Sequence, residues 1–90
     1  MKVLKIGAIW CNACNVMRPR WKKIEEENEW LETEYFDFDE EEELVEKYEI
    51  TDDKVPVFIY LDKEGNEVGR QNGEVSEADL LEAINKYKEM

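Results

Sequence analysis

The apolar positions at the start of the chain predict a strand followed by a helix. Residues 3–9, VLKIGAI, are short, apolar and rich in branched side chains, as in a strand buried on both faces. From Cys11 onward, apolar side chains recur at intervals of three and four, which places them on one face of a helix running to about Asn28. They are Cys14, Met17, Trp21 and Ile24. Pro19 lies inside this helix, where it removes a backbone hydrogen bond and kinks the axis.

The middle of the chain predicts a second strand and a short acidic helix. Residues 32–38, ETEYFDF, have the composition of a strand that carries aromatic side chains. Acidic residues at 39–43 favour a helix start because negative charge complements the helix dipole. Leu44, Val45 and Tyr48 give this short helix an apolar stripe.

The last third predicts a hairpin and a terminal helix. Residues 55–61, VPVFIYL, are the strongest strand pattern, with a proline that can occupy only the first position or an edge of a strand. A glycine-containing turn and a more polar returning strand make 57–71 a hairpin. Ser76 and Asp79 form a capping box at the start of the last helix. Its buried stripe comprises Leu80, Leu81, Ile84 and Tyr87.

The order strand, helix, strand, helix, strand, strand, helix predicts a single α/β domain over residues 1–90. We expect a mixed four-stranded sheet with helices on both faces. The alternating first part implies parallel strands with right-handed crossovers, and the hairpin adds an antiparallel strand at one edge. Reactive groups in such sheets collect where the carboxyl end of a strand meets the next helix, and Cys11 falls at such a junction.

Composition supports this interpretation and indicates in which part of the cell the protein resides. Hydrophobic residues make up 42% of the chain and charged residues 40%, as in a small, heavily solvated globular domain. No run of about 18 apolar residues occurs, and the first residues lack the pattern of a signal peptide. We therefore expect a soluble cytoplasmic monomer without membrane contacts.

The net charge of −12 is distributed unevenly along the chain. Residues 1–24 carry six bases and no acids, residues 25–49 carry fourteen acids and one base, and residues 50–90 carry ten acids and five bases. An acidic chain argues against nucleic acid and anionic membranes as partners, since both bind clustered Lys and Arg. The cysteines lie in the one basic third.

The chain has two cysteines and no histidine. This excludes histidine-based nucleophilic triads, Cys2His2 zinc sites and a multi-disulfide framework. Three interpretations of the cysteine pair remain. They are a redox pair, half of a zinc or iron–sulfur site shared by a dimer, and two buried structural cysteines. We expect no bound metal, and a redox pair needs no cofactor because its electrons reside in the two sulfurs.

The spacing of Cys11 and Cys14 suits a disulfide. Three residues of helix give about 300° of rotation and a rise of about 4.5 Å, so the two Cα atoms lie roughly 5 Å apart. Cys11, in the first turn, faces unpaired backbone N–H groups and the positive end of the helix dipole, which favour its thiolate. Cys14 should be more buried and less ionised. Such asymmetry suits attack on a substrate disulfide by Cys11 and resolution by Cys14.

The sequence WCNAC resembles the thioredoxin superfamily when it is taken together with Pro19, the KVP before the third strand, the hairpin and NGEVSEADLLEAI. The resemblance covers nearly the whole chain but lacks the N-terminal strand and helix of full-length thioredoxins. It implies a dithiol-disulfide oxidoreductase with Cys11 as nucleophile and Cys14 as resolving thiol. It also implies partners that are protein or small-molecule disulfides or dithiols, and a reductase or other electron donor.

The resemblance assigns further residues to a substrate site. Pro56 corresponds to a cis-proline beside the cysteines, Val55 offers backbone groups to an extended substrate, and Gly73 lets another backbone come close. Trp10 either caps the core or forms a flat apolar platform for substrate.

Two departures from the thioredoxin pattern concern the strength of reduction. Asn12 and Ala13 replace the usual Gly-Pro between the cysteines, a position that tunes redox potential in the family. Lys5 stands where thioredoxins usually carry a buried carboxylate, and it is either a tuning residue or a structural one whose stem is buried. The alternative function is a thioredoxin-fold binding or regulatory module whose cysteines sense redox state or bind metal without turnover.

Overall fold

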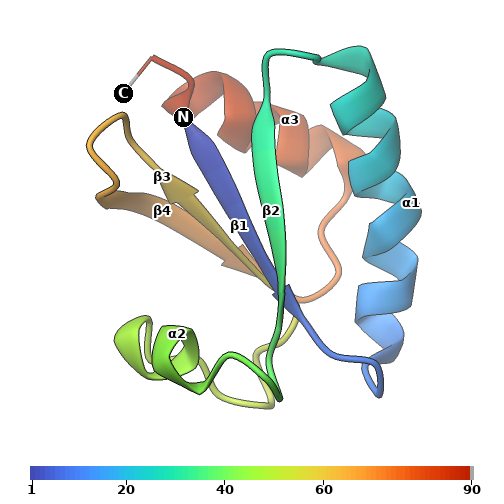
Figure 1. The fold of residues 1–90 in the computed structure, drawn as a ribbon. Coiled ribbons are helices and arrows are strands. Elements are labelled where there is room, and N and C mark those ends of the chain that lie inside the picture. The colour runs from blue at the N-terminus through green and yellow to red at the C-terminus, as the bar shows by residue number, and fades with distance from the viewer. Residues whose placement is uncertain (90) are drawn as a thin grey trace.

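A four-stranded mixed sheet forms the centre of the structure, a computed structural model that describes residues 1–89 (Figure 1). The strands are β1 (Lys2–Gly7), β2 (Glu32–Asp37), β3 (Val57–Leu61) and β4 (Glu67–Asn72). The helices are α1 (Asn12–Glu27), α2 (Glu42–Lys47) and α3 (Glu77–Tyr87). The order of elements along the chain is the predicted one, and the strands lie side by side as β2-β1-β3-β4.

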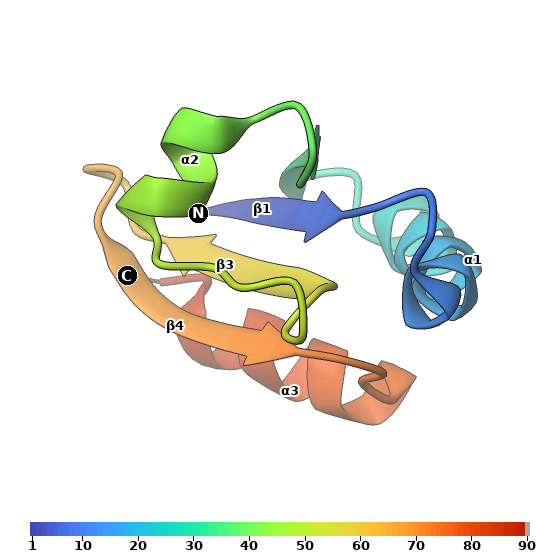
Figure 2. The ribbon, with the colours of Figure 1, turned by 90° about the horizontal axis from the view of Figure 1, so that it is seen from below.

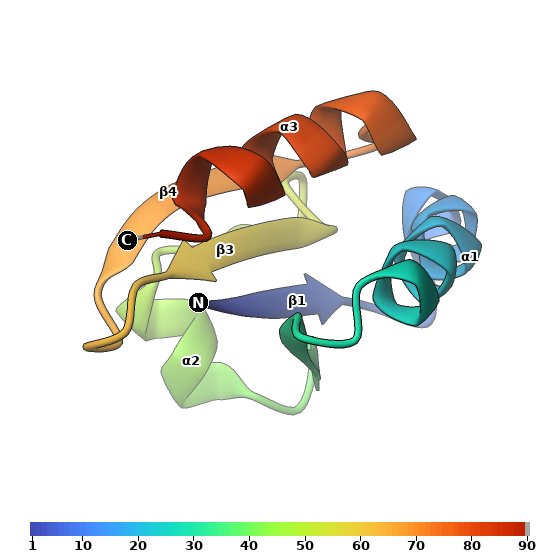
Figure 3. The same cartoon turned by 90° about the horizontal axis from the view of Figure 1, so that it is seen from above.

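Helices cover both faces of the sheet, which confirms the predicted α/β fold. Helices α1 and α3 pack on one face, and α2 lies across the other (Figures 2 and 3). Because successive side chains of a strand point to opposite faces, β1 contributes to two separate clusters. Val3 packs with the side chains of α1 and α3, whereas Leu4 and Ile6 pack toward α2.

Helix α1 agrees closely with the periodicity in its sequence. Its buried side chains are Cys14, Met17, Trp21 and Ile24, which are the four positions predicted to face the core. Pro19 lies within the helix on its exposed side. The helix is therefore held to the sheet by one apolar stripe, and that stripe begins at Cys14.

The predicted direction of β3 is wrong. Strand β2 runs parallel to β1, but β3 runs antiparallel to it, with Val57 opposite Ile6. Strand β2 ends opposite Gly7, so the chain leaves β2 and enters β3 at the same end of the sheet. The six-residue helix α2 is only about 9 Å long, whereas a six-residue strand spans about 20 Å. Helix α2 thus turns the chain at this end instead of returning it to the other.

The predicted helix signals agree with the structure. The Ser76 hydroxyl accepts a hydrogen bond of 3.1 Å from the Asp79 backbone N–H at the start of α3. Of the predicted buried stripe of α3, Leu80 and Ile84 are fully buried, whereas Leu81 and Tyr87 are only partly buried. The apolar stripe of α2 is only partly buried and packs against the cluster on its side of the sheet.

A close contact between β4 and α3 depends on a glycine. A Cβ atom at Gly69 would lie 2.3 Å from the Tyr87 ring, so the missing side chain makes room for that ring. The Tyr87 ring packs 5.2 Å, between centroids, from Tyr60, whose hydroxyl donates a 2.7 Å hydrogen bond to Gln71. Burial raises the pKa of Tyr60, which therefore stays protonated within this contact.

We expect Gly69→Ala to lower the free energy of unfolding by about 1–3 kcal/mol, because the Tyr87 ring must move away from the new methyl group. Urea denaturation followed by circular dichroism measures the change. In a Tyr87→Ala background the same substitution should cost much less, since the ring it collides with is gone. Equal costs in the two backgrounds would contradict this account of Gly69.

Candidate active site

The two cysteines lie where β1 meets α1. Cys11 is the N-cap of α1, and its sulfur accepts a 3.1 Å hydrogen bond from the backbone N–H of Cys14. This N–H is one of the helix-start donors that have no partner within the helix. The sulfur of Cys11 therefore occupies the place of a capping oxygen, as the sequence predicts for a thiol in the first turn.

The residues assigned by resemblance meet around Cys11. The Val55–Pro56 peptide bond is cis, and the Cys11 thiol donates to the Val55 carbonyl oxygen at 3.7 Å. The Gly73 backbone N–H donates a 2.8 Å hydrogen bond to the Pro56 carbonyl. Segments far apart in the sequence thus come together at one end of the sheet.

Gly73 has a backbone conformation that favours glycine. Its φ is +78°, in the left-handed region, and a Cβ atom there would meet nothing within 4 Å. The backbone angle, rather than crowding within the chain, therefore explains the glycine at this position. The approach of another backbone at Gly73 stays a prediction.

Cys14 differs from Cys11 in its partners more than in its exposure. The exposed fractions are 4% for Cys14 and 6% for Cys11, so the expected difference in burial is small. Burial, together with a hydrogen bond to Cys11, raises the pKa of the Cys14 thiol to about 11. Cys14 is accordingly a thiol at neutral pH, as predicted.

Sequence reasoning missed two residues that contact this site. A Cβ atom on Gly7 would lie 3.1 Å from the Cys14 sulfur and 3.2 Å from the hydroxyl oxygen of Tyr35. Gly7 therefore lets a helix side chain and a β2 side chain approach the same point of β1. A glycine inside an apolar strand often marks such a close approach, and this signal could have identified it.

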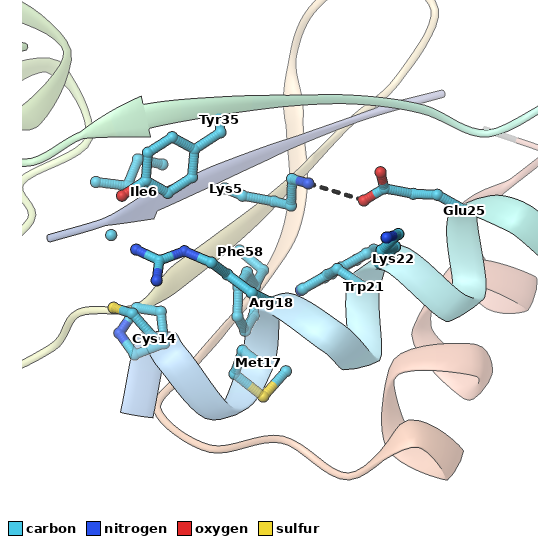
Figure 4. Close-up of a pocket in the computed structure, with 12 residues that line it drawn as sticks. Lys5, Ile6, Cys14, Met17, Arg18, Trp21, Lys22, Glu25, Tyr35 and Phe58 are labelled. Atoms are coloured by element: carbon cyan, nitrogen blue, oxygen red, sulfur yellow. Dashed lines mark hydrogen bonds and ion pairs between the residues drawn. The ribbon is translucent and has the colours of Figure 1, made fainter. Parts of the chain in front are cut away.

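Lys5 faces a cavity that also contains Cys14. The cavity, about 160 Å³ in volume, lies between α1 and the sheet. Cys14 lines one end, and the other end holds the ion pair of Lys5 with Glu25, whose Nζ and Oε2 atoms are 2.8 Å apart (Figure 4). The Lys5 ammonium also lies 5.8 Å from the centroid of the Trp21 ring. Sequence reasoning did not identify Glu25 as its partner.

Trp10 is an exposed surface residue and does not cap the core. Its side chain is 52% exposed, and its indole Nε1 donates a 2.9 Å hydrogen bond to Asp39. The ring meets Phe38 edge to face, with centroids 6.3 Å apart. These two contacts hold the indole on the surface just before α1, and its role as a platform for substrate stays a prediction.

Asn12 and Ala13 form the first turn of α1 between the two cysteines. Asn12 is exposed, and Ala13 is partly buried against the cluster on the α2 side of the sheet. The dipeptide therefore separates the sulfurs without adding a charge.

Within residues 1–89, no group of three or more Cys, Asp or Glu side chains is placed to hold a metal ion. None of the helices described is long and apolar enough to span a bilayer.

Several solved structures share this fold over most of their length. A thioredoxin from Fasciola hepatica is 31% identical, with a TM-score of 0.85 over 96% of this chain and 79% of its own. Thioredoxin NaTrxh from Nicotiana alata is 26% identical, with a TM-score of 0.85 over 96% and 71%. Oxidised thioredoxin from Plasmodium falciparum is 28% identical, with a TM-score of 0.79 over 96% and 79%. No curated protein matches the chain.

The sequence itself matches a family described as thioredoxin. The match covers residues 1–78, from β1 into the first turn of α3, and so includes both cysteines and the Val55–Pro56 bond. Together with the sheet order and the Cys-x-x-Cys pair at the start of α1, it shows that this chain belongs to the thioredoxin family.

Proposed function

We propose that the chain is a dithiol-disulfide oxidoreductase in which Cys11 attacks and Cys14 resolves. One observation carries the proposal: the Cys11 sulfur caps α1 and accepts the Cys14 N–H, while the Cys14 thiol forms a hydrogen bond with Cys11. The pair thus combines a sulfur that accepts a backbone N–H at the start of α1 with a second thiol held in contact with it.

In the first step the Cys11 thiolate attacks one sulfur of a substrate disulfide. A bond forms between Cys11 and that sulfur, and the other substrate sulfur leaves with the bonding electron pair as a thiolate. The Cys14 N–H supports the negative charge on Cys11 before attack. The product is a mixed disulfide.

In the second step Cys14 loses its proton and attacks the Cys11 sulfur. The bond between Cys11 and the substrate breaks, the substrate sulfur leaves with its electrons, and a Cys11–Cys14 disulfide forms. The substrate has gained two electrons and the pair has lost two. A dithiol reductant or a reductase then returns the pair to its reduced form.

We propose that substrate binds at the surface around Cys11. Trp10 offers an exposed apolar ring, and Val55 and Pro56 lie beside the sulfur. The space beside Gly73 leaves room for an extended segment of a partner. A protein or small-molecule disulfide could then reach Cys11 from the loop end of the sheet.

Exchange of either cysteine for serine should separate the two steps. We expect Cys11→Ser to lower insulin-reduction turnover more than about 100-fold, because the nucleophile is lost. Cys14→Ser should still attack and should accumulate a mixed disulfide that is visible on a non-reducing gel. The two variants are matched controls for each other, and circular dichroism checks their folding.

The rival function predicts a different pattern. A redox-sensing module would form the Cys11–Cys14 disulfide under oxidation but would not turn over a disulfide substrate in excess dithiothreitol. Wild-type turnover equal to that of Cys11→Ser would therefore rule out the enzyme.

The two thiols should also differ in alkylation. With the pKa of Cys14 near 11, only about one molecule in a thousand carries its thiolate at pH 8. We expect iodoacetamide at pH 7–8 to label the Cys14→Ser variant, through Cys11, much faster than the Cys11→Ser variant. Burial, the largest cause of the raised pKa of Cys14, is still present in the Cys11→Ser variant. Equal labelling rates, measured by mass spectrometry, would contradict the assigned roles.

We propose that Asn12 and Ala13 tune the potential of the pair, with Lys5 as a further contributor through its place in the Cys14 cavity. Replacing both residues of the dipeptide to give Gly-Pro should move the potential toward roughly −270 mV, the value of reducing thioredoxins. Equilibration with glutathione buffers measures it, and Lys5→Met provides the comparison. If the double substitution left the redox potential of the cysteine pair unchanged, Asn12 and Ala13 would not be tuning residues.

A further inference from the structure

Resolution of the mixed disulfide requires that Cys14 lose a proton from a buried position. Burial keeps Cys14 protonated, so the step needs an acceptor near its sulfur. Glu25, the carboxylate that lines the same cavity, lies eleven residues further along α1, which is about 16 Å along the helix axis. Its carboxylate is bound by Lys5. An acceptor for the Cys14 proton must therefore lie at the other end of the cavity.

Tyr35 places a hydroxyl at that end. It lies on β2 directly opposite Lys5 of β1, and its ring extends over Gly7. The Tyr35 hydroxyl oxygen and the Cys14 sulfur lie 3.2 Å and 3.1 Å from the same point, the position that a Gly7 Cβ would take. The two atoms therefore lie at most about 6.3 Å apart, a separation that one bridging water molecule can span. Figure 4 shows both side chains at this end, away from the Lys5–Glu25 pair.

The side chain that carries this hydroxyl reaches the surface. Tyr35 is 46% exposed, whereas Cys14 is 4% exposed, so the phenol connects a buried sulfur with the surface. A hydroxyl is both a donor and an acceptor of hydrogen bonds. It can take a proton on its oxygen while giving its own proton to water, and it need not become an ion.

We propose that the Tyr35 hydroxyl relays the Cys14 proton to solvent as Cys14 resolves the mixed disulfide; the inference rests on the proposed oxidoreductase function. The Cys14 S–H proton moves through a bridging water molecule to the Tyr35 oxygen, and the Tyr35 O–H proton moves to bulk water. The freed sulfur electron pair forms the bond to Cys11. The bond from Cys11 to the substrate breaks, and the substrate sulfur leaves with its electron pair.

The charged groups around Cys14 suit this role. Arg18, one turn further along α1, favours the Cys14 thiolate and so opposes the effect of burial on its pKa. Lys22 also lines the cavity from α1, and the Lys5–Glu25 pair adds no net charge. The proton thus leaves a sulfur whose transient anion faces cations.

Tyr35→Phe is the direct test, because it keeps the ring against Gly7 and removes only the hydroxyl. Stopped-flow measurement of mixed-disulfide decay with a small aromatic disulfide gives the resolution rate. We expect Tyr35→Phe to slow resolution about 10- to 100-fold at pH 7. Attack by Cys11 is measured separately in the Cys14→Ser background, where resolution does not occur, and its rate should not change.

A pH profile and chemical rescue separate a relay from a structural role. Without the hydroxyl, resolution should depend on bases in solution, so its rate should rise with pH and with added imidazole. Tyr48→Phe is the matched control, since Tyr48 packs on α2 away from the cavity, and it should behave as wild type.

Two results would overturn the relay while leaving the oxidoreductase in place. One is a Tyr35→Phe variant that resolves at the wild-type rate from pH 6 to 9. The other is a Tyr35→Phe variant that resolves slowly and is not rescued by imidazole, combined with a Glu25→Gln variant that resolves equally slowly. That pair of results would identify Glu25 as the group that takes the Cys14 proton. Loss of disulfide exchange in the wild type itself would instead refute the proposed function.

Discussion

The hydrogen bond from the Cys14 N–H to the Cys11 sulfur links the start of α1 to the chemistry of the site. The first backbone N–H groups of a helix have no partner within it, and a side-chain oxygen at the N-cap often accepts from one of them. Here a sulfur does so, and the bond is 3.1 Å long. The bond that caps the helix therefore also positions the sulfur that we propose as the nucleophile. The stripe that begins at Cys14 holds this helix on the sheet, so core packing also supports the sulfur.

Local charge at the site differs from the charge of the whole protein. The chain carries a net charge of −12, yet the cavity beside Cys14 is lined by Lys5, Arg18 and Lys22 with Glu25 as its one carboxylate. The bases come from the first 24 residues, where β1 and α1 meet. A thiolate formed there experiences nearby cations, while the acidic α2 segment lies on the opposite face of the sheet (Figure 3). Charge segregation along the sequence thus becomes charge segregation in space.

The sequence predicted most of what depends on local spacing. The buried stripe of α1, the Ser76 cap and the two cysteines all follow from intervals of three or four residues. The direction of β3 could not be predicted from such spacing, because an apolar strand has the same pattern in either direction. The short helix α2 determines the end of the sheet at which the chain enters β3. The Tyr35 contact depends on strand register and on the absence of a side chain at Gly7. Such through-space relations leave no periodic signal in one sequence.

The two edge strands of the sheet carry charges along their open sides. Strand β2 presents Glu32 and Glu34, and β4 presents Glu67 and Arg70, all of them exposed. Charged edges of this kind oppose the addition of a strand from another molecule. The sheet is thus protected against edge-to-edge aggregation even though its central strand β3, VFIYL, is buried at every position. The buried strand β3 is kept from pairing with another molecule because β1 and β4 occupy both of its sides and the outer edges of the sheet carry charge.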